Sequence, residues 1–389
     1  MRNPLSDKIV KIPPSGIRKF FDIVSEMKDA ISLGVGEPDF ETPWHIREEG
    51  IYSLEKGRTF YTSNAGLKPL KVEICEYLKR RCGVTYDPDQ EILVTVGGSE
   101  AIDIALRAML NEGDEVLIPQ PSYVSYMPCV TLADGVPVTI ELEEKDQFKL
   151  TPEKLLEKIT DKTKILVLPF PNNPTGAIME KEELEEIVKI VLEKDLFVIS
   201  DEIYSELTYK TEHVSIASLP GMRERTIVIN GFSKGFAMTG WRLGYCCGPE
   251  TIIEQMVKLH QFAIMCAPTN SQYAAIEGLR NCDDEVEEMR KSYNQRRRFL
   301  MHEFARMGLE CFEPFGAFYV FPSILEFNMT SEEFATRLLE EEKVAVVPGT
   351  AFGTCGEGFL RISYAYSLDD LKVALGRLGR FIQRLRNER

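Results

Sequence analysis

The sequence predicts an α/β protein. It has a large domain with a mostly parallel seven-stranded sheet covered by helices, and a smaller α+β domain formed by the two chain ends. From about residue 91, short apolar runs alternate with longer segments whose apolar residues recur at helical spacing. Several of these runs are apolar throughout, which is typical of strands buried on both faces. After about residue 280 the pattern changes to charged helical segments and a few short apolar runs.

Seven apolar runs are the predicted strands of the large sheet. They are Ile92–Val96, Glu115–Pro119, Val136–Leu142, Lys164–Pro169, Leu196–Ser200, Thr226–Asn230 and Leu243–Cys247. Between them, Glu100–Leu110 and Lys181–Leu192 carry apolar residues at helical spacing. Strands that alternate with helices in this way form mostly parallel sheets. The last strand follows Asn230 after too little chain for a helical crossover, so an antiparallel direction is expected for it.

The C-terminal part predicts a compact α+β unit. Its expected helices are Val286–Met307, Ser331–Glu341 and a basic helix from Leu368. Its expected strands are Leu309–Glu313 and Gly316–Pro322, joined by a tight turn, and then Val344–Pro348 and Phe359–Ala365. The expected organisation is an N-terminal segment, residues 1–35, that packs with the small domain, a large domain over residues 36–280, and the small domain over residues 281–389.

Charge and composition exclude several classes of partner. The formal net charge of −15 repels nucleic acid and anionic lipid surfaces, so neither is an expected partner. No apolar run is long enough to span a membrane or to form a signal peptide. The nine cysteines form no C-x-x-C pair and are expected to be reduced thiols of a cytoplasmic protein. The histidines, which are His45, His213, His260 and His302, lie far apart without ligand spacing, so no metal site is expected.

The segment after the first predicted strand is a candidate phosphate site. Gly97-Gly98-Ser99-Glu100 opens a helix, and the backbone N–H groups and dipole of a helix N-terminus favour an anion. A plain tight turn is the alternative. No G-x-G-x-x-G motif follows a strand and no P-loop is present, so the sequence does not match a dinucleotide or nucleotide fingerprint.

Polar residues also follow three other strands, and ligands of α/β sheets bind at the carboxyl ends of strands. Asn173 lies in a turn fixed by two prolines and a glycine, Asp201 ends a very apolar strand, and Lys234 follows the next one. Arg242 is eight positions further on and is suited to clamp a phosphate. Each has an ordinary alternative: a structured turn for Asn173, a helix cap for Asp201 and a surface position for Lys234. Their expected convergence at one sheet edge is what favours a site in which the lysine amine condenses with an aldehyde.

Nine motifs in chain order carry a family resemblance. They are Gly36-Glu37-Pro38-Asp39-Phe40, Tyr61 to Gly66, Gly97 to Ala101, Asn173-Pro174-Thr175-Gly176, Asp201-Glu202-Ile203-Tyr204, Ser233-Lys234, Met238 to Gly244, Gly316-Ala317-Phe318-Tyr319 and Arg361-Ile362-Ser363. With them the chain resembles the fold-type I aminotransferases, the aspartate/aromatic aminotransferase superfamily of classes I and II. The resemblance covers nearly the whole chain, although any one motif alone is weak.

The resemblance implies pyridoxal 5'-phosphate as cofactor and a role for each matching residue. Lys234 would hold the cofactor as a Schiff base and later move the substrate proton. Asp201 would pair with the ring nitrogen, Tyr204 and Asn173 would bind the phenolic oxygen, and Tyr123 would stack on the ring. The implied phosphate ligands are the backbone N–H groups of Ser99 and Glu100, the Ser233 hydroxyl, Arg242, and Tyr61 from a partner subunit.

The same resemblance implies a homodimer with shared active sites and a transfer of an amino group from an L-amino acid to a 2-oxo acid such as 2-oxoglutarate. Arg361 would grip the substrate α-carboxylate, helped by Asn173 and the backbone of Gly36. An aromatic or aspartate-like donor is expected. Some related aspartate enzymes carry a lysine where this chain has Ser99, which argues against a strictly acidic preference. Arg18 could replace that charge, or it could be a surface residue.

The sequence leaves other functions as alternatives. A β-lyase, a synthase or an acetyl-diaminopimelate-type transaminase would use the same cofactor residues, because a fold does not fix the chemistry. A ligand-sensing module of a regulator is disfavoured, since the stretch before Gly34 is too short for a DNA-binding domain. A nicotinamide-dependent dehydrogenase lacks its glycine fingerprint here.

Overall fold

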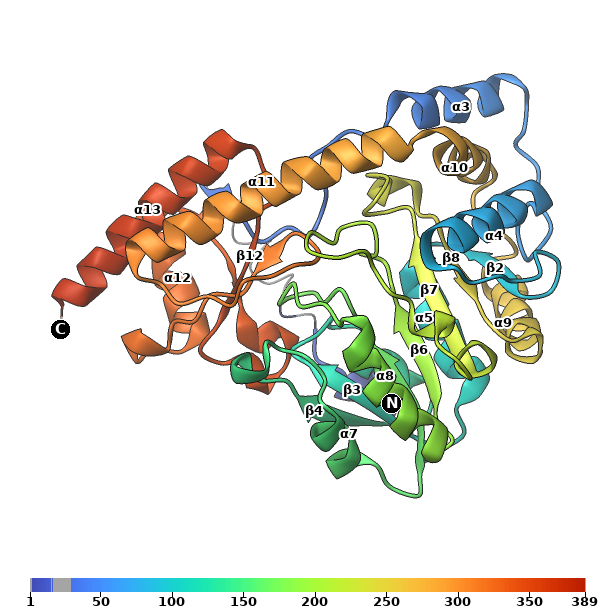
Figure 1. Ribbon diagram of the computed structural model, residues 1–389, viewed down its shortest axis with the longest axis horizontal. Helices are drawn as coiled ribbons and strands as arrows, with labels where there is room; N and C mark the ends of the chain where they lie inside the picture. Colours follow the sequence, from blue (N-terminus) through green and yellow to red (C-terminus); the bar gives the residue numbers. More distant parts are fainter. Residues whose placement is uncertain (1, 15, 17–28, 389) are drawn as a thin grey trace.

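The computed structural model describes residues 2–14, 16 and 29–388 and shows an α/β fold built around a seven-stranded sheet (Figure 1). The strands of this sheet are β2 (Ile92–Thr95), β3 (Glu115–Gln120), β4 (Val136–Glu141), β5 (Thr163–Leu168), β6 (Phe197–Asp201), β7 (Thr226–Gly231) and β8 (Gly244–Cys247). Their order is β2-β8-β7-β6-β5-β3-β4. Arg18, for which two roles were open, lies outside the described residues.

The predicted strands are confirmed with shifts of a residue or two at their ends. β8 runs antiparallel to both neighbours, β2 and β7, as its short connection predicts. Between Gly231 and Gly244 the chain makes turns and one short 3-10 segment, Thr239–Trp241, because so few residues cannot form a crossover helix.

Helices cover both faces of the large sheet. The α-helices of the described residues are α1 (Asp7–Lys11), α3 (Trp44–Glu55), α4 (Lys68–Cys82), α5 (Gly98–Met109), α6 (Tyr126–Leu132), α7 (Pro152–Lys158), α8 (Lys181–Glu193), α9 (Glu250–Ala263), α10 (Thr269–Asn281), α11 (Asp283–Met307), α12 (Ser331–Glu342) and α13 (Leu368–Asn387).

Successive side chains of each strand alternate between the two faces of the sheet, and each face packs against different helices. Leu93 of β2 and Cys246 of β8 belong to the same core as α5 and α9, whereas the neighbouring Val94 and Tyr245 pack on the side of α4. Successive side chains of a strand point to opposite faces, so strands that are apolar throughout can bury both. The central strands are therefore buried on both faces, and the residues that follow β5, β6 and β7 are where polar groups meet a cavity.

Short strands form the C-terminal part of the structure. β12 (Leu360–Ser363) pairs antiparallel with β9 (Tyr319–Val320) and with β11 (Val347–Pro348). β10 (Val344–Ala345) pairs with β1 (Ile31–Ser32), so a segment near the N-terminus lies beside the C-terminal elements. α11 extends from the large sheet toward α13 (Figure 1). The domain boundaries at residues 35 and 280 stay a prediction.

Two expectations for this part are wrong. The hairpin of Leu309–Glu313 and Gly316–Pro322 is reduced to one isolated bridge, Cys311 with Pro322, and the two-residue β9. The backbone of the expected turn bonds to other segments instead. The N–H of Gly316 donates to the carbonyl of Gly176, and the N–H of Ala317 donates to the carbonyl of Leu207.

The single strand expected over Val344–Pro348 is also wrong. It divides at Val346 into β10 and β11, which belong to two different sheets. None of the helices in the described part of the chain combines the length and the hydropathy needed to cross a membrane.

Candidate active site

A cavity of about 440 Å³ opens where β5, β6 and β7 end. Its lining contains these predicted site residues: Gly36, Ser99, Tyr123, Asn173, Asp201, Tyr204, Ser233, Lys234, Arg242 and Arg361. The convergence at one sheet edge that the sequence predicts is thereby confirmed, because side chains from distant segments share one cavity. The volume is in the range of small-molecule sites.

Glu100 and Tyr61 are the two predicted site residues whose side chains do not line the cavity. The Glu100 carboxylate turns back, accepting the backbone N–H of Val96 and lying 2.6 Å from Nδ1 of the buried His260. The side chain of Tyr61 is 82% exposed. Their expected roles, a backbone N–H for Glu100 and a contact across subunits for Tyr61, stay predictions.

The phosphate-type end of the cavity is formed by the start of α5 and by Arg242. Gly97 precedes the helix with a φ of 79°, and Gly98 and Ser99 form its first turn. A Cβ atom on Gly97 would lie 2.8 Å from Nη2 of Arg242, so glycine is what lets the guanidinium close on this turn. Free backbone N–H groups, a helix dipole, the buried Ser233 hydroxyl and a guanidinium together suit a phosphate.

Lys234 follows β7 and is enclosed by the cavity walls. Its ammonium donates to the backbone carbonyl of Gly36 and lies 5.8 Å from the ring centroid of Tyr204 and 5.6 Å from that of Phe318. Burial lowers the pKa of Lys234 to about 8, with Arg361 and Arg242 acting in the same direction and Glu37 opposing them. Near neutral pH a useful fraction of this amine is therefore unprotonated and nucleophilic.

Asp201 is the last residue of β6 and its carboxylate is held from two sides. Oδ2 accepts the hydroxyl of Tyr126 at 2.7 Å, and Oδ1 accepts the backbone N–H of Ile203 at 3.2 Å. Burial raises the pKa of Asp201, and these two hydrogen bonds act against that rise. A cationic partner in the cavity would complete the stabilisation of its charge.

Arg361 is a buried cation without a carboxylate. It is 2% exposed, and no ion pair to it occurs in the described part of the chain. Nη1 donates to Oδ1 of Asn173 at 2.9 Å and Nη2 donates to the carbonyl of Gly34, while Nε is buried and has no partner among the residues that the structure describes. The guanidinium lies between the rings of Tyr319 and Phe352, at 4.5 and 4.8 Å from their centroids. A buried charge of this kind needs an anion, and a carboxylate ligand supplies one.

Three further polar residues of the lining, to which the sequence-based prediction gives no role, contact a predicted site residue or another residue of the lining. Tyr126 binds Asp201, Tyr319 lies 2.9 Å from Tyr204 through their hydroxyls, and Glu37 accepts the hydroxyl of Thr239. Two features of the sequence point to these residues. Tyr126 follows Tyr123 by three positions, about one helical turn, and Glu37 and Tyr319 lie in motifs that match the family. Their contacts span from 75 to 202 positions of chain, which local patterns do not reveal.

The chain belongs to the family of class I and II aminotransferases, whose model matches residues 28–378, and it is a transaminase. It is 48% identical to an aspartate aminotransferase of Pyrococcus abyssi, over 97% of this chain and 98% of that protein. It is 44% identical to aromatic-amino-acid aminotransferase 2 of Thermococcus litoralis, over 97% and 98%. The crystal structure of an aromatic aminotransferase from Pyrococcus horikoshii superposes with a TM-score of 0.90 at 47% identity, covering 95% of this chain and 99% of that one.

Proposed function

We propose that the protein uses pyridoxal 5'-phosphate to move an amino group from an L-amino acid to a 2-oxo acid. The observation that carries this proposal is the buried, unpaired Arg361 in the same cavity as the buried amine of Lys234. One group suits the α-carboxylate that both substrates share, and the other suits an aldehyde cofactor.

The donor groups of the cavity fit this cofactor. The start of α5, Ser233 and Arg242 would hold the phosphate, and Tyr123 would cover one face of the ring. Asp201 would pair with the ring nitrogen, and Asn173 and Tyr204 would bind the phenolic oxygen. When bound, the cofactor supplies an electron sink for bond changes at the α-carbon of the substrate.

The residues of the chain have separate roles in the remaining steps of amino transfer. Lys234 would hold the cofactor covalently at rest and would move the proton to and from the α-carbon of the substrate. Asp201 keeps its charge against the ring nitrogen because Tyr126 and the Ile203 amide stabilise the carboxylate. Arg361 orients the α-carboxylate, while the rings of Tyr319 and Phe352 exclude water from its guanidinium.

The cavity supports an aromatic or other uncharged donor more than a dicarboxylic one. Its lining cations are Lys234, Arg242 and Arg361, and each already has a role. Ser99 brings no charge, and Glu37 places a carboxylate at the cavity beside Thr239. A second carboxylate on the donor would share the cavity with Glu37, and no further cation among the described lining residues is free to receive it.

We further propose a homodimer in the cytoplasm. Phe60, Tyr61 and Phe262 are 80, 82 and 86% exposed, which is costly for three large apolar side chains in a monomer. The nine cysteines all lie in the described part of the chain and none is disulfide-bonded, in keeping with a reducing compartment.

Turnover with a panel of amino donors and 2-oxo acids tests the function. Purified enzyme with cofactor should transfer the amino group to 2-oxoglutarate, with a higher kcat/KM for phenylalanine or tyrosine than for aspartate. Arg361→Ala should raise KM on the order of 100-fold or more, the effect of losing a charge-assisted pair, and should leave the cofactor spectrum unchanged. Cofactor-loaded enzyme that consumes amino acids without aminating any 2-oxo acid would instead indicate a lyase or synthase.

A further inference from the structure

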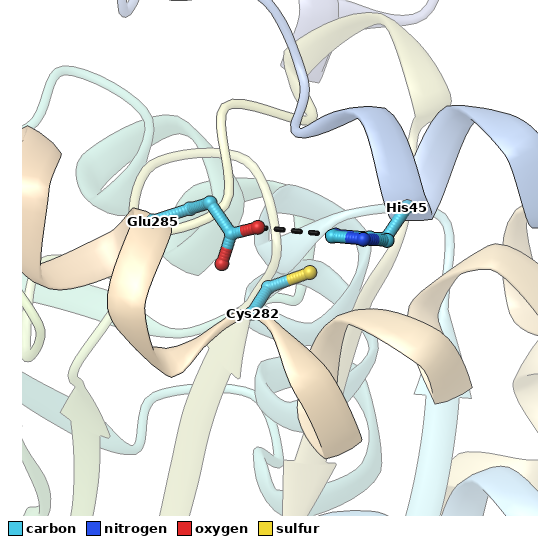
Figure 2. Close-up of side chains that lie close together, drawn as sticks. All are labelled: His45, Cys282 and Glu285. Atoms are coloured by element: carbon cyan, nitrogen blue, oxygen red, sulfur yellow. Dashed lines mark hydrogen bonds and ion pairs between the residues drawn. The ribbon is translucent and has the colours of Figure 1, made fainter.

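A second group of ligand-type side chains lies apart from the cavity, where α3 meets the junction of α10 and α11 (Figure 2). His45 is in the first turn of α3, Cys282 separates α10 from α11, and Glu285 is in the first turn of α11. One donor atom from each residue lies within 4.8 Å of the others. Figure 2 shows the Cys282 sulfur pointing toward the gap between the Glu285 carboxylate and the His45 ring.

The sequence gives no sign of this group. The wide separation of the four histidines predicts no metal site, but His45 and Glu285, which are 240 positions apart, meet in the fold. A histidine nitrogen, a thiol and a carboxylate form the mixed ligand set that zinc accepts, whereas calcium and magnesium prefer oxygen alone.

The spacing of the donors suits a tetrahedral ion. Nδ1 of His45 lies 3.1 Å from Oε1 of Glu285. Two ligands held about 2.0–2.2 Å from a tetrahedral zinc ion are roughly 3.3 Å apart, so nitrogen and oxygen already have the required separation. The Cys282 sulfur lies within 4.8 Å of a donor atom of each of these residues, and rotation of the partly exposed His45 and Glu285 side chains can bring these atoms closer to it.

The charges around the group leave it free for a cation. Arg80 and Arg81 are paired with Asp283, the first residue of α11, at 3.2 and 3.1 Å, and Arg47 of α3 is paired with Glu41. Within the described part of the chain, no lysine or arginine pairs with Glu285, whose one ion-pair partner is His45. The histidine side chain is 55% exposed, so water can occupy a fourth position on that side.

We propose that His45, Cys282 and Glu285 form a binding site for one divalent ion of the zinc class, with water as fourth ligand. This site is independent of the amino-transfer chemistry. Because its ligands come from α3 and from the start of α11, a bound ion would cross-link α3, which packs on α10, to the long helix α11 that runs toward α13 (Figure 1).

Metal titration of the holoenzyme tests the site. Zinc, measured against a chromophoric chelator, should bind with one high-affinity ion per chain. Cobalt in its place should give tetrahedral d–d bands at visible wavelengths longer than those at which the cofactor absorbs. His45→Gln should lower the zinc affinity 10-fold or more and remove these bands, because a ligand is lost. The unfolding midpoint should rise with zinc in the wild type and not in this variant.

Variants of the same residue types outside the group serve as controls for the histidine and cysteine ligands. Cys282→Ser should act like His45→Gln, whereas the exposed His302→Gln and the half-buried Cys266→Ser should bind zinc like the wild type. His45 is on the surface, so its variant should fold normally even if the buried Cys282 does not tolerate serine. A wild type that binds no ion, or equal affinities in His45→Gln and His302→Gln, would overturn the proposal.

Discussion

At the residue scale, burial shifts the pKa values of Asp201 and Lys234 in opposite directions. Burial disfavours charge, so it raises the pKa of Asp201 and lowers that of Lys234. Asp201 recovers part of its charge stabilisation from Tyr126 and the Ile203 amide, whereas Lys234 donates to a neutral acceptor, the carbonyl of Gly36. The two hydrogen bonds of Asp201 therefore offset part of the effect of burial on its carboxylate, whereas the amine of Lys234 readily gives up its proton.

The lowered pKa of Lys234 predicts the pH dependence of cofactor capture by the apoenzyme. Only the neutral amine attacks an aldehyde, and with a pKa of about 8 the neutral fraction rises roughly tenfold per pH unit up to that value and then levels off. Stopped-flow absorbance should therefore show a reconstitution rate that climbs from pH 6 to about 8 and becomes flat above it. A free amine of ordinary pKa mixed with the cofactor is the control, and a protein rate still climbing at pH 10 would contradict the prediction.

Asp201→Asn keeps the shape of the side chain and removes its charge. The ring nitrogen would lose the anion that keeps it protonated, so kcat should fall by several orders of magnitude, or about 4–6 kcal/mol in a site shielded from water. Steady-state kinetics on enzyme whose absorbance shows bound cofactor would measure this loss. Near-normal turnover would mean that Asp201 is a structural cap.

Tyr126→Phe should affect the same carboxylate more weakly than Asp201→Asn does. Without the 2.7 Å hydrogen bond, the pKa of Asp201 should rise further, and the carboxylate should lose its charge at a higher pH. The acidic limb of the kcat profile should move to higher pH, with a loss on the order of 10-fold below it and little change well above it. An unchanged acidic limb would show that Tyr126 only packs against Asp201.

Residue chemistry of this kind is only partly readable from the sequence. Lys234, Asp201 and Asn173 follow strands of one parallel sheet, and the rule that such ends share an edge is enough to bring them together. Tyr126 reaches Asp201 from a different segment, and no periodicity relates them. The same holds for His45 and Cys282, which meet because α3 packs on α10.

At the element scale, the first turn of α5 positions the phosphate end of the cavity. Gly97 is needed there for two separate reasons, a left-handed φ of 79° and the approach of Arg242. The sequence predicts this helix start because glycines follow an apolar strand. It does not predict which carbonyls receive the amides of Gly316 and Ala317, and there the expected hairpin failed.

Gly97→Ala should weaken cofactor binding. The backbone conformation of Gly97, φ 79° with ψ 168°, costs alanine on the order of 1–3 kcal/mol, and the added Cβ would lie 2.8 Å from Nη2 of Arg242 and force that group to move. We expect a rise in the cofactor dissociation constant of about 10-fold or more, measured by equilibrium dialysis of the apoenzyme.

Gly113→Ala is a matched control for that experiment. Its φ is 88°, and a Cβ there meets no atom within 4 Å. This variant should lose a similar amount of stability and keep its cofactor affinity. If both variants bind the cofactor equally well, Gly97 does not set the position of Arg242.

At the scale of the whole molecule, Tyr61 belongs to a preformed apolar patch rather than to the cavity of its own chain. The patch is defined here by Phe60, Tyr61 and Phe262, which are all highly exposed. Two hydrogen bonds hold its two segments together, from Asn64 to the carbonyl of Met265 and from Thr269 to the carbonyl of Phe60, both 2.7 Å long. A rigid apolar patch of this kind is suited to cover a second copy of the chain.

The proposed dimer predicts that Tyr61 serves the partner's cofactor. Tyr61→Phe should weaken cofactor retention by about 1–2 kcal/mol, the value of one hydrogen bond to a charged group.

Hybrid dimers give the sharper test. Inactive Lys234→Ala chains are mixed with Tyr61→Ala chains at a cofactor concentration that leaves the latter empty. In a two-fold dimer with shared sites, each hybrid carries both lesions in one site and none in the other. Random mixing at equal amounts makes half of the dimers hybrids, so activity should return to about a quarter of the wild-type value. If Tyr61 instead serves its own chain, every site keeps one lesion, and mixing the two inactive proteins restores nothing.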